Sequence, residues 1–145
     1  MKPDFIEGLR VRDIMIDEVT TLKRNDQLTL ADDIMRLGRI RHLPVLDDDG
    51  KQLVGIVSQR DLFRGALAQA LGYGAHAQRK MLESLQVKEV MTVDLITTTP
   101  ETLLVEAARI LMERKIGCLP VVANGRLVGI LTEADFVALV ARKSG

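Results

Sequence analysis

The chain has 145 residues, 47% of them hydrophobic, and its 20 basic and 20 acidic side chains cancel. This composition supports a folded core, while the zero net charge and an aromatic content of 3% argue against nucleic-acid binding. The single cysteine, Cys118, excludes an intrachain disulfide. No stretch resembles a membrane span or a secretory signal, so the sequence favours a cytoplasmic protein.

The first half of the chain predicts a strand, a helix, two strands and a second helix. Val19-Thr20-Thr21 is a short run of mostly β-branched residues, as is typical of a strand. Apolar residues from Leu28 to Leu37 follow helical spacing. LPVL and LVGIVS then read as strands joined by the turn DDDGKQ, and a helix is expected from Gln59.

A connector, RGALAQALGYGAHAQRK, follows at residues 64–80. Its alanine and leucine content favours helix, and Gly72-Tyr73-Gly74 is expected to break or kink it.

The second half repeats the first at an offset of 76 residues, which falls to 74 after a shorter hairpin turn. A strand is expected at Leu95-Ile96-Thr97, and Pro100 behind Thr99 reads as the first-turn proline of a helix. Asn124-Gly125 predicts a tight hairpin between LPVV and LVGILT, and a helix follows from Glu133. The repeats therefore span residues 5–63 and 81–143.

The most informative phrase is LVGIVSQRD, which recurs as LVGILTEAD. Gly55 and its counterpart Gly129 lie inside strands, which implies close approach of either a ligand or the other repeat. Each phrase then places a hydroxyl where strand becomes helix and an aspartate three residues later. Helix capping alone explains this pattern. The alternative is a binding site, with an anion at the helix N-terminus and the aspartate on a ribose diol.

Three paired motifs together resemble a CBS domain pair, also called a Bateman module. They are VRDIM and VKEVM, RHLPV and GCLPV, and LVGIVSQRD and LVGILTEAD. The resemblance implies an α/β (α+β) fold, in which tandem βαββα CBS repeats pack sheet to sheet about a pseudo-twofold axis and leave two clefts. It also implies binding of an adenosine-containing ligand, AMP, ADP, ATP or S-adenosylmethionine, and regulation of an attached or associated protein.

The resemblance also assigns roles to positions of this sequence. Asp61 and Asp135 would hold ribose hydroxyls, Ser58 and Thr132 would face phosphate, and Ile56 and Ile130 of LVGI would line adenine. Asp17 and Val93, two residues after the repeated methionines, would contact the base through their backbone. The pairs before each LP, Arg41-His42 and Gly117-Cys118, would meet phosphates. The flanking Ile40, Pro44, Ile116 and Pro120 complete the set.

The two clefts are not expected to be equivalent. Arg41-His42 supplies phosphate donors, whereas Gly117-Cys118 does not. Arg39, Arg114 and Lys115 are near in sequence and are the alternative donors. Arg60 beside the first aspartate is likewise replaced by Ala134.

The leading hypothesis is a stand-alone regulator that senses adenine nucleotides, forms a homodimer and acts in trans on an unidentified effector. The alternative is a ligand-free dimerisation or scaffold module. No enzyme, required cofactor, metal site, membrane contact or nucleic-acid partner is expected. The Cys118 and His42 pair is not established as a nucleophilic pair by sequence, and Asp47-Asp48-Asp49 reads as a solvated turn. Five methionines, Met112 among them, are expected to fill the core.

Overall fold

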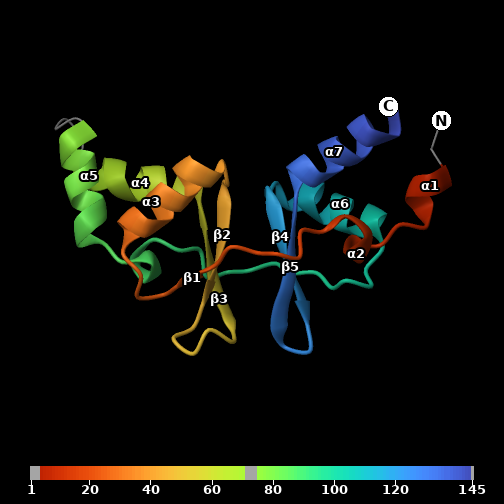
Figure 1. Cartoon of the computed structure of the whole chain (residues 1–145), viewed down its shortest axis with the longest axis horizontal. Coiled ribbons are helices and arrows are strands. Elements are labelled where there is room, and N and C mark those ends of the chain that lie inside the picture. Colours follow the sequence, from red (N-terminus) through yellow and green to blue (C-terminus); the bar gives the residue numbers. More distant parts are fainter. Residues whose placement is uncertain (1–3, 71–74, 145) are drawn as a thin grey trace. The chain divides into compact units, whose positions relative to one another are not determined.

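The computed structural model describes residues 4–70 and 75–144 and shows a mixed α/β fold (Figure 1). The chain divides into two compact units. One is continuous and comprises Thr20–Leu95, and the other joins Met1–Val19 to Ile96–Gly145. In the described part of the chain, no helix has the length and apolar character that a membrane crossing requires.

The Thr20–Leu95 unit contains a three-stranded sheet of order β1-β2-β3. The strands are β1 (Leu22–Lys23), β2 (His42–Leu46) and β3 (Leu53–Ser58), with β1 parallel and β3 antiparallel to β2. The first strand therefore begins at Leu22, and the prediction of residues 19–21 was wrong. Leu22 is the apolar side chain that enters the core, with 1% exposure.

Four helical segments accompany this sheet: α3 (Leu28–Gly38), α4 (Gln59–Ala70), α5 (Ala75–Ser84) and the 3₁₀ turn η1 (Val87–Glu89). The predicted starts of α3 and α4 are confirmed, while the Gly72–Gly74 break lies outside the described residues. Leu37 does not belong to the buried face of α3, because its side chain is 83% exposed.

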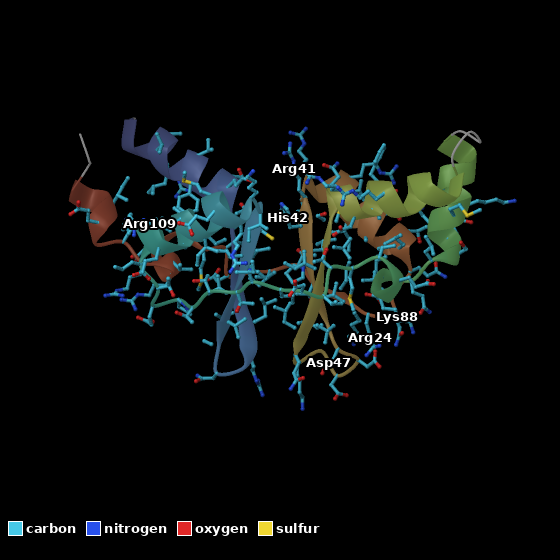
Figure 2. All side chains as sticks on the ribbon, turned by 180° about the vertical axis from the view of Figure 1, so that it is seen from behind. Arg24, Arg41, His42, Asp47, Lys88 and Arg109 are labelled. Atoms are coloured by element: carbon cyan, nitrogen blue, oxygen red, sulfur yellow. The ribbon has the colours of Figure 1, made fainter. Side chains whose placement is uncertain are left out.

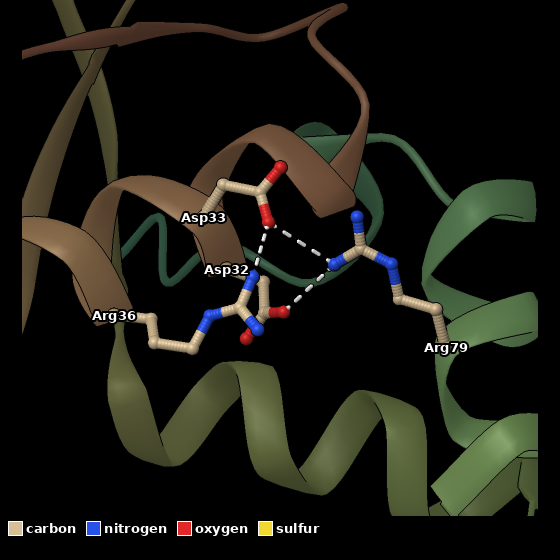
Figure 3. A network of polar contacts seen from close by, with 4 residues as sticks. All are labelled: Asp32, Asp33, Arg36 and Arg79. Atoms are coloured by element: carbon tan, nitrogen blue, oxygen red, sulfur yellow. Dashed lines mark hydrogen bonds and ion pairs between the residues drawn. The ribbon is translucent and has the colours of Figure 1, made fainter.

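The connector helix α5 is tied to α3 by ion pairs (Figure 3). Arg79 donates to Asp32 at 3.0 Å and to Asp33 at 3.2 Å, and Arg36 donates to Asp33 at 2.7 Å. Helix α5 is thus tied into this unit.

The second unit contains a hairpin of β4 (Cys118–Ala123) and β5 (Arg126–Thr132). Asn124 and Gly125 both have positive φ, 53° and 76°, which confirms the predicted two-residue turn. Helices α1 (Asp4–Glu7), α2 (Val11–Ile14), α6 (Leu104–Arg114) and α7 (Glu133–Ser144) complete the unit.

Three local predictions fail in this second unit. The strand expected at residues 95–97 is reduced to one bridge, in which Thr98 pairs in parallel with Val121. Pro100 lies in a turn, because α6 begins only at Leu104. Met112 is 78% exposed and does not fill the core.

Each unit combines the hairpin of one repeat with the N-terminal motif of the other. Val87, from the second VKEVM motif, is fully buried in the cluster that contains Leu43 of β2. Val11, from VRDIM, is fully buried with Leu119 of β4. The compact units therefore cut across the sequence repeats.

The two strand glycines make this exchange possible. A Cβ on Gly55 would lie 2.5 Å from Sδ of Met91, and a Cβ on Gly129 would lie 2.7 Å from Sδ of Met15. Of the two explanations for these glycines, the structure therefore supports close approach of the other repeat's segment.

Candidate functional site

The first candidate site, the Asp61 junction, lies where β3 passes into α4. Ser58 and Asp61 cap each other: the backbone N–H of Ser58 donates to Asp61 Oδ2 at 2.9 Å, and that of Asp61 donates to Ser58 Oγ at 3.0 Å. This reciprocal pair satisfies backbone groups at the start of α4. The hydroxyl and the carboxylate are both part-buried.

Thr92 enters the Asp61 junction from the segment after η1, and the sequence analysis missed it. Its backbone exchanges two hydrogen bonds with Ile56 of β3, at 3.0 and 2.8 Å. Its hydroxyl donates to Asp61, 3.3 Å from Oδ2 and 3.5 Å from Oδ1. The only sequence signal for this neighbour is Gly55, since it admits Met91 and thereby brings Thr92 to the strand.

Two basic residues lie at the same end of the hairpin. Arg41 O accepts a hydrogen bond from Gln59 N at 2.8 Å, which places Arg41 directly at the start of α4. His42 pairs with Ser58 in the β2–β3 ladder. Figure 2 places Arg41 and His42 at one end of β2 and Asp47 beyond the other end, in the turn that joins β2 to β3.

Asp47 accepts hydrogen bonds from the backbone of its own turn. Its Oδ1 accepts from Lys51 N at 2.9 Å and Gln52 N at 3.2 Å. These backbone donors, first Lys51 and then Gln52, lower the pKa of Asp47. Among the residues described, no cluster of histidine, cysteine, aspartate and glutamate could hold a metal ion.

The Asp135 junction is the counterpart, where β5 passes into α7. Thr132 N donates to Asp135 Oδ2 at 2.8 Å, and Thr132 Oγ1 donates to the same oxygen at 3.3 Å. Here the hydroxyl is a donor to the carboxylate, and among the described residues it accepts no helix N–H. Gly117 O accepts a hydrogen bond from Glu133 N at 3.2 Å. This bond corresponds to the one from Gln59 N to Arg41 O at the first junction.

Cys118 pairs with Thr132 in the β4–β5 ladder, at the position that His42 holds in the other unit. Burial raises the pKa of its thiol to about 12. A thiol in this state is a poor nucleophile at neutral pH.

The positions two residues after the methionines are exchanged between the units. Asp17 follows Ile16, whose backbone bridges Ile130 of β5. Val93 follows Thr92, which bridges Ile56. Asp17 therefore belongs with Asp135, and Val93 with Asp61. Sequence alone could not make this assignment, because both partners present the same LVGI phrase.

The remaining predicted residues lie along the same strands. Pro44 pairs with Ile56 and Pro120 with Ile130, so each proline is next to the isoleucine of its own unit. Ile40 and Ile116 are partly buried hydrophobics packed against the two cores. Eight of the sixteen predicted positions therefore belong to each compact unit, and their binding roles stay predictions.

A hydroxyl–carboxylate junction at the end of a β-hairpin, built twice in one chain, defines a tandem-repeat module. The CBS domain family model matches residues 11–68 and 87–142. The chain belongs to the CBS-domain family.

Solved structures of CBS pairs share the fold. A Vibrio cholerae protein described as an acetoin utilization protein (AcuB) is 37% identical, with a TM-score of 0.79 over 94% of this chain and 93% of that one. CBSX2, solved in complex with AMP, is 30% identical with a TM-score of 0.75 over 95% and 100% of the two chains. The CBS pair of MJ0100, solved with 5′-methylthioadenosine and S-adenosylmethionine, is 29% identical with a TM-score of 0.73 over 93% and 98%.

Curated relatives include longer proteins. MJ1225 of Methanocaldococcus jannaschii is 32% identical over 130 residues, which cover 90% of this chain and 42% of that protein. The chain therefore spans less than half the length of this relative.

Proposed function

We propose that the chain binds an adenosine-containing ligand at each junction and regulates a partner protein in trans. The module would perform no chemistry of its own. Ligand binding would shift the conformation of the module to the extent that affinity differs between conformations.

The observation that carries this proposal is the division of labour between the two oxygens of each aspartate. Oδ2 of Asp61 accepts the cap from Ser58 N, and Oδ2 of Asp135 accepts it from Thr132 N. Oδ1 of Asp61 has only the 3.5 Å contact with Thr92, and Oδ1 of Asp135 has no hydrogen bond within the described residues. Capping and ribose binding are therefore compatible, because each role uses a different oxygen.

The surroundings of each aspartate suit a nucleoside. Ile56 and Ile130 supply a buried apolar wall beside it, and the start of a 12-residue helix supplies backbone N–H groups that favour an anion. The complexes of CBSX2 with AMP and of MJ0100 with S-adenosylmethionine and 5′-methylthioadenosine support the adenosine class of ligand.

The proposal includes a homodimer formed through the outer helices. Phe63 of α4 is 61% exposed and Val137 of α7 is 69% exposed, and they are counterparts in the two repeats. On α7, Val140 lies one turn after Val137 and is 59% exposed, and adjacent exposed apolar side chains of this kind support a protein contact. A cytoplasmic location, suited to a chain with a single cysteine, is part of the same proposal.

Isothermal titration with AMP, ADP, ATP and S-adenosylmethionine tests the proposal. We expect saturable binding, lost at one junction in Asp61→Asn and at the other in Asp135→Asn. An asparagine oxygen still accepts the backbone cap, so both variants should fold with little change in melting temperature. Absence of both heat and thermal stabilisation at millimolar ligand would favour the scaffold module, because a ligand far above its Kd must stabilise the fold.

A further inference from the structure

We propose that the two junctions select different adenosine ligands by charge. The Asp61 junction takes a phosphorylated nucleoside, and the Asp135 junction takes an adenosine ligand that bears no phosphate and is neutral or cationic. This inference rests on the proposed function and names the ligand class of each site.

Two arginines lie at the start of α4, beside the Asp61 junction along the chain. Arg41 is held at the start of α4 through its backbone bond to Gln59, and Arg60 is the second residue of that helix. Both side chains are exposed, and neither forms an ion pair with another described residue. Guanidinium groups and a helix N-terminus are both favourable partners for a phosphate.

The Asp135 junction has acidic or neutral residues at the corresponding positions. Gly117 replaces Arg41, Ala134 replaces Arg60, and Glu133 replaces Gln59. Asp17 adds a further carboxylate where the first junction has Val93, because Asp17 directly follows Ile16, which bridges Ile130 of β5. Three carboxylates, those of Asp17, Glu133 and Asp135, would repel a phosphate group and favour a cation.

Of the other charges nearby, Glu113 and Arg114 have the uncharged counterparts Leu37 and Gly38, and their opposite charges cancel. Arg39 and its counterpart Lys115 both carry a positive charge and both have φ of 55° at the end of the preceding helix. Asp94 and Glu18 likewise match in sign. The apolar wall, the aspartate, the hydroxyl and the helix N-terminus are common to both junctions. Discrimination by charge therefore falls on the positions that differ.

The first experiment isolates each junction in the full chain. Asp135→Asn leaves the Asp61 junction, for which we expect AMP to bind at least about tenfold more tightly than adenosine, or ~1.4 kcal/mol. Asp61→Asn leaves the Asp135 junction, for which we expect adenosine and S-adenosylmethionine each to bind at least about tenfold more tightly than AMP. Isothermal titration with these three probes gives the Kd values.

The second experiment exchanges the charges. Arg41→Gly with Arg60→Ala, in the Asp135→Asn chain, should abolish the preference for AMP and leave adenosine binding within about twofold. Gly117→Arg with Ala134→Arg, in the Asp61→Asn chain, should create a preference for AMP. Gly117 is not among the described glycines with positive φ.

The outcomes separate this inference from the proposed function. Binding at both junctions with the same preference between AMP and adenosine, or a preference for AMP that survives loss of both arginines, overturns the division by charge alone. Absence of binding by every adenosine probe overturns the proposed function, and the inference with it.

Discussion

The two compact units share an apolar skeleton and differ in their polar chemistry. Each has a buried valine from the other repeat's motif, a strand glycine against which a methionine packs, and an aspartate that caps a helix. Against this constant background, Leu22 is replaced by Thr98, His42 by Cys118 and Ser58 by Thr132. The skeleton explains why the units fold alike, and the substitutions explain why they should behave differently.

The largest difference is expected in chemical reactivity at the His42 and Cys118 positions. Because burial raises the pKa of Cys118 from 9.0 to about 12, its thiolate fraction at pH 8 falls by about a thousandfold. Alkylation by iodoacetamide should therefore be slow in the native chain and fast in urea. Rapid native labelling at pH 8 would contradict the buried state of this thiol.

The exchange of segments predicts which unit each valine stabilises. Val87→Ala should cost about 2 kcal/mol and lower amide protection in β2 and β3, because Val87 packs in that core. The matched variant Val11→Ala should have a similar cost but act on β4 and β5. Hydrogen exchange resolved by residue distinguishes the two. If Val87→Ala lowered amide protection in β4 and β5 instead, the result would contradict the observed packing.

The hydroxyls of the two junctions should differ in their contribution to stability. Ser58→Ala removes the acceptor of Asp61 N–H and should cost about 1 kcal/mol. Thr132→Ala should cost less, because this hydroxyl only donates to Asp135 Oδ2. Urea unfolding measures both. Equal costs would mean that the two caps are equivalent.

At the matched positions Leu22 and Thr98, a substitution is expected to raise stability, unlike the substitutions above. Thr98 is 5% exposed, and its Oγ1 is buried without a hydrogen bond among the described residues. Thr98→Val keeps the shape and removes the unpaired hydroxyl, so stability should rise by up to about 1 kcal/mol. Urea unfolding is again the measurement, and a loss of stability would reveal a partner for this hydroxyl.

The smallest effect concerns pH and only one unit. The hydrogen bond from Arg79 lowers the pKa of Asp33 below 3.8. The counterpart of Asp33 in the other unit is Arg109, so this effect is confined to one unit. The stabilisation is therefore present above pH 3.8 and is lost as the pH falls through the lower folded value. In Arg79→Gln, an NMR titration should show the pKa of Asp33 rising toward 3.8. Asp47, held by backbone donors, is the control whose pKa should not change.

The sequence by itself determined the repeat, the main helices, the hairpins and the recurrence of a hydroxyl and an aspartate at the start of a helix. These features depend on contacts between residues that are close along the chain, such as the positive-φ turn at Asn124-Gly125 and the cap between Ser58 and Asp61. Local spacing and residue type are sufficient to specify them.

Only the tertiary structure decided which segment packs with which hairpin. Val11 and Val87 occupy equivalent motifs, and both hairpins offer the same LVGI strand, so local pattern favours neither pairing. The long-range backbone bonds of Ile16 with Ile130 and of Thr92 with Ile56 settle the pairing. They bring Thr92 to Asp61 and place Asp17 in the unit of Asp135, and thereby add one carboxylate to the charge difference that the two hairpins already carry in their sequences.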